Sequence, residues 1–258
     1  MEILGPDFRA GLRHALYRPF NPAGLGIAIA VFIALVIVNQ LILLPAFAVG
    51  ISALTSGLAS IQTEFLRGAL LAVLPAGLLT AYLAWILARH RGVDPSEVLA
   101  LRFPSLGFLG WAVILGGFPV VLYILFGVLA WLLRIDITSS GLVEQAVMQL
   151  GADPLYILVA GGLVIGAPFA EELTFRGQIF SALSQTRMGF LGASIVTSAL
   201  WAAIHGFTQP LHIVGLLFVM GLALSWLLVR FGSLWVTIVC HAVWNAIQAL
   251  ALYWMSLP

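Results

Sequence analysis

Three polar spacings in the last third of an otherwise apolar chain carry residue types that can do chemistry. They are Glu171-Glu172-Leu-Thr-Phe-Arg176, Trp201-Ala-Ala-Ile-His205 and His241-Ala-Val-Trp-Asn245. Each lies inside, or at the end of, an apolar run long enough to cross a bilayer, where an ionisable group is costly and usually functional. Carboxylates beside imidazoles are the groups that water-activating hydrolysis uses. The sequence therefore predicts a hydrolytic site within a membrane.

The spacing of the first motif predicts different roles for its two acids. Glu172 and Arg176 are four residues apart with the acid first, which is the better order for an ion pair on one helix face. Glu171 is rotated by about 100° from Glu172, so we expect it to face a different cavity, unpaired by Arg176. Glu172 and Arg176 are then a structural pair, and Glu171 is the chemical group. The alternative is that both acids are packed polar residues near an interface.

The other two motifs place imidazoles one helical turn from a second side chain. His205 follows Trp201 on the same face, where a histidine by itself is more often structural. His241 and Asn245 share a face that Gln248 extends, and interhelical hydrogen bonding is the alternative explanation of this stripe. Asn39-Gln40 and His212 have no chemical partner at a recognisable spacing and are interpreted as packing or interface polar groups. Cys240 is interpreted as a small buried hydrophobe.

The composition excludes several classes of protein. Hydrophobic residues make up 62% of the chain and charged residues 8%, with a mean hydropathy of +1.11, whereas soluble domains carry about 25% charged residues. A net charge of +1 without a basic stripe excludes a nucleic-acid partner. All 11 basic residues are arginine, so a lysine Schiff base and a Ser–Lys dyad are also excluded.

The hydropathy pattern predicts an all-α, polytopic transmembrane helical bundle of about seven to eight spans. A helix needs about 20 apolar residues to span, and the candidates cover approximately residues 24–49, 67–88, 106–133, 155–180, 190–206, 211–229 and 233–256. The fourth can split at Pro168, which cannot donate a hydrogen bond to Val164. We expect one transmembrane domain, 1–258, with residues 155–256 as its catalytic core.

The arginines predict the orientation in the membrane. One side of the bundle receives Arg9, Arg13, Arg18, Arg89, Arg91, Arg102, Arg187 and Arg230, and the opposite side only Arg67 and Arg134. The positive-inside rule then puts the N-terminus in the cytoplasm and the C-terminus outside. The first apolar run is too long for a signal peptide, so we expect an uncleaved integral protein of the plasma (inner) membrane, with the lipid bilayer as its surroundings.

Helix geometry predicts that the three motifs meet. Glu171 precedes, and His205 follows, the turn at Arg187–Gly189 by similar numbers of residues, which at 1.5 Å per residue places both about 24 Å from its tip. His241, nine residues after Gly232, reaches a similar depth from the same side. We therefore expect one cavity in the cytoplasmic half of the membrane.

Together, Glu-Glu-x3-Arg, aromatic-x3-His and His-x3-Asn, in this order, resemble the CPBP family of intramembrane proteases, which contains type II CAAX prenyl endopeptidases and bacteriocin-immunity homologues. The resemblance covers the final 40% of the chain. It implies that Glu171, His205, His241 and Asn245 are catalytic, supported by Glu172, Arg176 and Trp201. The family usually has Phe at the position of Trp201, and because the aromatic character is kept, we expect a changed cavity shape and unchanged chemistry.

The predicted function is that of an intramembrane endopeptidase acting on a membrane-associated protein or peptide, including prenylated CAAX-type substrates. Glu171 activates a water held by His205, and His241 with Asn245 stabilises the oxyanion. The rival mechanism uses Glu171, His205 and His241 as ligands of a divalent metal such as zinc. The sequence lacks the His-Glu-x2-His, Gly-x-Gly-Asp and Gly-x-Ser-x-Gly motifs of other protease classes.

Two alternatives stay open at this point. A non-catalytic membrane scaffold or bacteriocin self-immunity protein would keep the fold without needing an unpaired carboxylate at membrane depth. A small-solute transporter would use the same residues as a proton relay, and inverted repeats, which are typical of transporters, are not found in the sequence.

Overall fold

The computed structural model describes residues 3–57, 61–89, 93–135, 140–150 and 154–256, and these ranges contain helices and no strands. Four of the long apolar helices are continuous: α4 (Ile61–Ala88), α6 (Phe108–Leu133), α12 (Leu211–Phe231) and α13 (Leu234–Ser256). Two further long segments contain π-helical turns: α2 with α3 (Gly24–Ile37 and Leu44–Ser56, joined by Val38–Leu43), and α8 to α10 (Tyr156–Gly161, Ala167–Glu171 and Ser181–Ser184, joined by Gly162–Gly166 and Glu172–Phe180). The apolar helix α11 (Gly189–His205) is shorter. Shorter helices are α1 (Pro6–Arg13), α5 (Pro95–Val98) and α7 (Leu142–Leu150).

These bounds confirm the predicted polytopic helical bundle. Among the described residues, six helices are long and apolar enough to cross a membrane, and α11 is a shorter apolar helix. The first span, Gly24–Thr55, has 32 residues and extends beyond the predicted end at residue 49. Pro168 does not split the fourth span, because the chain continues through Tyr156–Ser184 with π-helical segments on either side of α9.

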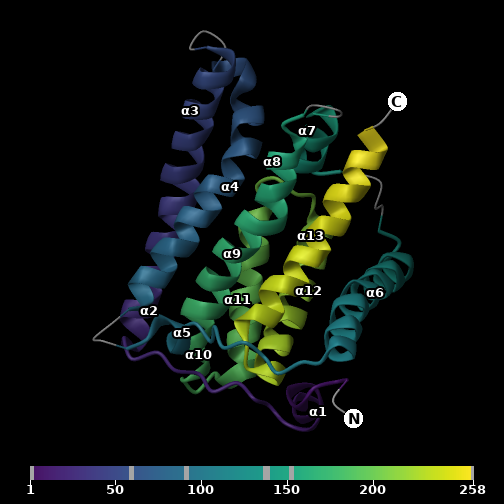
Figure 1. Cartoon of the computed structure of the whole chain (residues 1–258). Helices are drawn as coiled ribbons and strands as arrows, with labels where there is room; N and C mark the ends of the chain where they lie inside the picture. Colours follow the sequence, from purple (N-terminus) through teal and green to yellow (C-terminus); the bar gives the residue numbers. More distant parts are fainter. Residues whose placement is uncertain (1–2, 58–60, 90–92, 136–139, 151–153, 257–258) are drawn as a thin grey trace.

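The two ends of the bundle differ in what they carry. Figure 1 shows the N-terminal helix α1 together with α5 and α10 at one end, and α7 with the C-terminus at the other. At the first end, Asp94 caps α5 by accepting a hydrogen bond from the Ser96 N–H, and the bonds from Ser96 hold the pKa of this carboxyl below its usual value. Gly232, with a φ of 59°, makes the left-handed turn between α12 and α13 at the same end.

Close backbone contact fixes the fourth span against α4. A Cβ atom on Gly77 would overlap the backbone of Gly166, so both positions require a residue without a side chain. Small residues allow such approach between membrane helices, where van der Waals packing replaces the hydrophobic effect as the driving force. This contact holds the π-helical turn Gly162–Gly166 against α4, one turn before Glu171.

Candidate active site

Glu172 and Arg176 form the ion pair that their spacing predicts. Both side chains are completely buried, and the Arg176 Nη1 lies 3.1 Å from the Glu172 Oε1. The same oxygen accepts a hydrogen bond of 3.0 Å from the His241 Nδ1. The Arg176 guanidinium also lies 4.7 Å from the centre of the Trp201 ring, a cation–π distance. All three motifs are therefore joined around one buried charge pair.

Glu171 faces a different environment from its neighbour. It is the last residue of α9, its side chain is 24% exposed, and it lines a cavity of about 580 Å³. Its Oε2 accepts a hydrogen bond of 2.5 Å from the Trp201 Nε1. Sequence reasoning missed this bond, which an indole can donate to a carboxylate and a phenyl ring cannot. The expectation that Trp201 changes the cavity shape and leaves the chemistry unchanged stays a prediction.

Two imidazoles present a ring nitrogen to Glu171. The Nε2 of His205 lies 4.0 Å from Oε1, and the Nε2 of His241 lies 3.9 Å from Oε2. These separations are too long for direct hydrogen bonds and suit groups bridged by one water molecule. The predicted meeting of Glu171, His205 and His241 is thus present in the structure.

The other ring nitrogens set the tautomers. The His205 Nδ1 lies 2.8 Å from the Trp201 carbonyl oxygen, which can only accept, so this nitrogen carries the proton. The His241 Nδ1 lies against the Glu172 carboxylate in the same way. In both neutral rings Nε2 is therefore an acceptor directed at the region of Glu171.

The four residues predicted as catalytic differ in their access to the cavity. Glu171 and His205 line it together with Trp201. His241 is 3% exposed and contacts Glu171 from the protein side. The Asn245 Nδ2 donates a hydrogen bond of 2.7 Å to the Leu163 carbonyl.

The Asn245 bond has a local cause in the π-helical turn. The Ala167 N–H, which would reach Leu163 in an α-helix, bonds instead to the Gly162 carbonyl. The next residue, Pro168, has no N–H to offer. The Leu163 carbonyl is thereby left without a backbone donor, and the Asn245 side chain supplies one.

The donor atoms around Glu171 are farther apart than in an assembled zinc site. A tetrahedral zinc site holds N and O ligands at about 2.0–2.2 Å from the ion, which needs ligand atoms closer together than the 3.9 and 4.0 Å found here. The Glu171 Oε2 is also engaged by Trp201. Among the described residues no group of three or more His, Cys, Asp or Glu side chains is placed to hold a metal ion. The metal-ligand role predicted for Glu171, His205 and His241 stays a prediction.

The first span also contributes to the cavity, which sequence reasoning missed. Asn39 and Gln40 line it beside Leu35 and Leu41. Two amides at the centre of an apolar span could have indicated a functional role, but the sequence does not show which helix they face.

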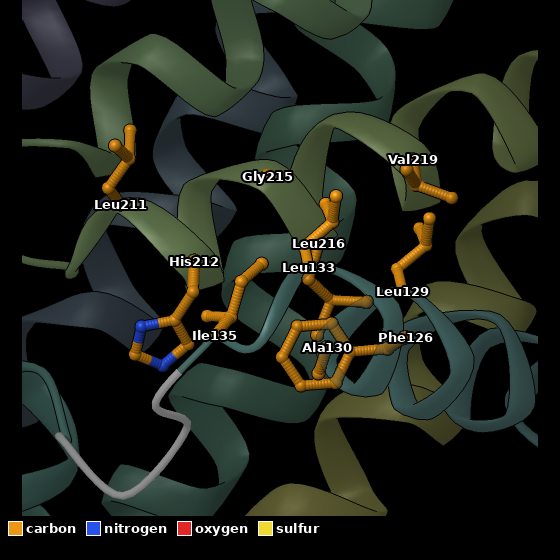
Figure 2. A pocket seen from close by; sticks show the side chains of 10 residues that line it. All are labelled: Phe126, Leu129, Ala130, Leu133, Ile135, Leu211, His212, Gly215, Leu216 and Val219. Carbon is orange, nitrogen blue, oxygen red and sulfur yellow. The ribbon is translucent and has the colours of Figure 1, made fainter.

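A second cavity, of about 400 Å³, lies between α6 and α12 (Figure 2). Its lining is apolar except for His212, whose ring stacks against Phe126 with centroids 6.4 Å apart. This lining contains no carboxylate or second imidazole, so it offers no acid–base pair.

The fold and the site together define a polytopic helical membrane protein in which spans distant in sequence bring a carboxylate and two imidazoles together. Residues 153–247, which contain all three motifs, match the family described as type II CAAX prenyl endopeptidase Rce1-like. This match confirms the resemblance to CPBP intramembrane proteases over the last part of the chain. No curated protein and no solved structure matches the chain.

Proposed function

We propose that this protein is an intramembrane endopeptidase that hydrolyses peptide bonds of membrane-associated proteins, including prenylated substrates of the CAAX type. The observation that carries the proposal is Glu171, a carboxylate that is free of Arg176, lines the cavity and has two imidazole Nε2 atoms about one water away. The family match supports the reaction class, since the family is named for endopeptidases that act on prenylated CAAX sequences.

In the proposed mechanism, Glu171 is the general base. A water between Glu171 and His205 loses a proton to the carboxylate, and its oxygen attacks the carbonyl carbon of the scissile peptide bond. Glu171 then returns the proton to the nitrogen of the leaving amine as the C–N bond breaks. The products are a new carboxylate and a new amine, so no covalent enzyme intermediate and no further reactant is required.

His241 must be protonated on both ring nitrogens to act as the oxyanion donor. Because its Nδ1 donates to Glu172, its Nε2 can donate to an oxyanion only in the imidazolium form. Asn245 keeps its second amide hydrogen for the same role, since one is directed at Leu163. Glu172 and Arg176 hold His241 and Trp201 in place, and this is their contribution to the reaction.

The cavity wall suits a lipid-modified peptide. Beside Glu171 it presents Leu35, Ile37, Leu41 and Phe207, an apolar surface of the kind that a prenyl chain or hydrophobic side chains would bury.

The reaction is tested by mass-spectrometric comparison of membrane-associated peptides from cells that contain the wild-type protein and cells that contain Glu171→Gln. We expect peptides with new carboxyl ends in the wild-type sample that are absent from the variant. Identical peptide sets would favour a non-catalytic scaffold with this fold.

The proposed orientation places the N-terminus and α5 in the cytoplasm of a plasma (inner) membrane. Glu97 is exposed on α5, and Met255 is 69% exposed near the C-terminus, while the native Cys240 is buried. Glu97→Cys should react with an impermeant maleimide only after lysis, and Met255→Cys in intact cells. Labelling of Glu97→Cys from outside would reverse the orientation.

A further inference from the structure

Asn39 and Gln40 occupy an unusual place for amide side chains. They lie at the centre of the 32-residue span Gly24–Thr55, where the helix widens into the π-helical turn Val38–Leu43. They belong to the part of the chain outside the family match at 153–247. Both line the cavity that contains Glu171 and His205.

A chain of hydrogen bonds fixes the orientation of the pair. The Gln40 Nε2 donates to the Asn39 Oδ1 at 3.1 Å, and the Asn39 Nδ2 donates to the Thr80 Oγ1 at 2.7 Å. The buried Thr80 hydroxyl in turn donates to the Ala76 carbonyl at 2.9 Å. Asn39 is therefore hydrogen-bonded to Thr80 of α4, and its side-chain oxygen accepts the hydrogen bond that orients the Gln40 amide.

The rest of the Gln40 amide is unused. Within the part of the chain that the structure describes, its Oε1 forms no hydrogen bond and its nitrogen has a second hydrogen to donate. A polar group at this depth is costly without a partner. Gln40 is exposed and lines the cavity, so a molecule that enters the cavity can reach its amide, and a ligand that offers both a donor and an acceptor would satisfy it.

A peptide unit has these two groups. A substrate segment must be unwound at the bond to be cleaved, and an unwound backbone in a membrane needs partners for its N–H and C=O groups. A primary amide can satisfy both at once, as one peptide group does for another. Its place in the lining, shared with Glu171, puts this pairing within the cavity where cleavage is proposed.

We propose that Asn39 and Gln40 form a binding subsite for the backbone of the substrate peptide, in which Gln40 pairs with one peptide unit and Asn39 with Thr80 holds Gln40 in position. This inference rests on the proposed function for the identity of the ligand. It assigns to the first span a role in substrate binding, and to the three motifs of the later spans the reaction itself.

The binding test uses full-length Glu171→Gln protein in lipid nanodiscs, in which the substrate is not consumed. The probes are a farnesylated synthetic peptide ending in a Cys-a-a-X sequence and its analogues with an ester in place of one backbone amide. Adding Gln40→Leu should weaken binding of the amide peptide by about tenfold, the value of one hydrogen bond. One ester analogue should bind more weakly than the amide to the Gln40 protein and equally well to the Gln40→Leu protein.

Matched variants separate binding from packing. Gln248 is also an amide in a span, bonds to the Tyr123 hydroxyl and is outside the lining of this cavity, so Gln248→Leu should bind the peptide as the parent does. Thr80→Val, which releases Asn39, should weaken binding less than Gln40→Leu. Unchanged affinity in Gln40→Leu, equal losses in Gln248→Leu, or no binding to the parent protein would overturn the inference.

Cleavage by the wild type is measured in parallel and separates the two proposals. If the wild type cleaves the peptide and Gln40→Leu binds it as tightly as the parent does, the subsite proposal is wrong and the peptidase proposal stands. If binding depends on Gln40 but the wild type does not cleave the peptide, the subsite proposal stands and the peptidase proposal is wrong.

Discussion

The indole Nε1 of Trp201 donates a hydrogen bond of 2.5 Å to Oε2 of Glu171, and this bond joins the second motif directly to the first. It fixes one carboxylate oxygen and leaves Oε1 on the side of His205. The ring of Trp201 also has its face toward Arg176 and its plane nearly perpendicular to the His205 and His241 rings. One buried side chain therefore orients the carboxylate proposed to be the base.

Replacing Trp201 with Phe should keep the ring and remove the donor. A hydrogen bond to a charged group contributes about 1.5–3 kcal/mol, so we expect kcat to fall roughly 10- to 100-fold with KM nearly unchanged. Steady-state cleavage of the farnesylated peptide checks this. Trp226→Phe is the matched control, because Trp226 is 52% exposed on α12. Wild-type kcat in Trp201→Phe would show that the bond does not position Glu171.

Glu172 and Arg176 should act on stability before chemistry. Both are completely buried, and removing one partner leaves the other as an uncompensated charge, at a cost of roughly 3–5 kcal/mol. Glu172→Ala and Arg176→Ala should therefore lower the folded yield and the melting temperature in detergent, while Glu171→Ala should fold normally and be inactive. If Glu172→Ala and Arg176→Ala both melt normally and lose cleavage, the structural role proposed for Glu172 is contradicted, and Glu172 takes the catalytic role proposed for Glu171.

Asn245 and Pro168 should be coupled through the Leu163 carbonyl. Asn245→Leu removes the only side-chain donor to that oxygen in the described structure, and an unsatisfied buried carbonyl costs about 1–3 kcal/mol. Pro168→Ala returns a backbone N–H at the position where Pro has none. Thermal unfolding of the single and double variants should therefore show a smaller loss for Asn245→Leu in the Pro168→Ala background.

The outcome also separates stability from catalysis at Asn245. If Asn245→Leu loses as much stability in the Pro168→Ala background as in the wild type, Asn245 and Pro168 are not coupled. Lost cleavage at unchanged stability would assign Asn245 to the oxyanion alone.

His241 allows the oxyanion and metal mechanisms to be compared. As an oxyanion donor it can be replaced in part by an amide, so His241→Gln should keep some activity and His241→Ala should lose about 10²–10³ in rate. As a metal ligand, both variants should lose activity equally and chelators should inactivate the wild type reversibly. Elemental analysis of protein purified without added metal accompanies these rates. Stoichiometric zinc with equal losses would contradict the glutamate–water mechanism.

The positions of the spans and the meeting of the motifs could be predicted because they depend on local patterns. Apolar runs set the ends of α6 and α13 within a few residues, and 1.5 Å per residue placed Glu171 and His205 at one depth. The Glu172–Arg176 pair followed from helical periodicity, since both partners lie on one turn.

The remaining contacts depend on tertiary packing, which no local pattern contains. His241 meets Glu172 across 69 positions in the sequence, and Asn39 meets Thr80 across 41. The π-helical turns shift the register after Gly162, so the partner of Asn245 is a main-chain carbonyl. The Trp201 bond to Glu171 needs the rotamers of both side chains, which the sequence alone does not specify.

The central claim, that Glu171 activates water for peptide hydrolysis, is tested most directly with purified protein in nanodiscs, the farnesylated Cys-a-a-X peptide and water enriched in oxygen-18. Mass spectrometry of the products should show one heavy oxygen in the new carboxylate with the wild type and no cleavage with Glu171→Gln, at equal melting temperatures. Cleavage by Glu171→Gln at the wild-type rate would contradict the account.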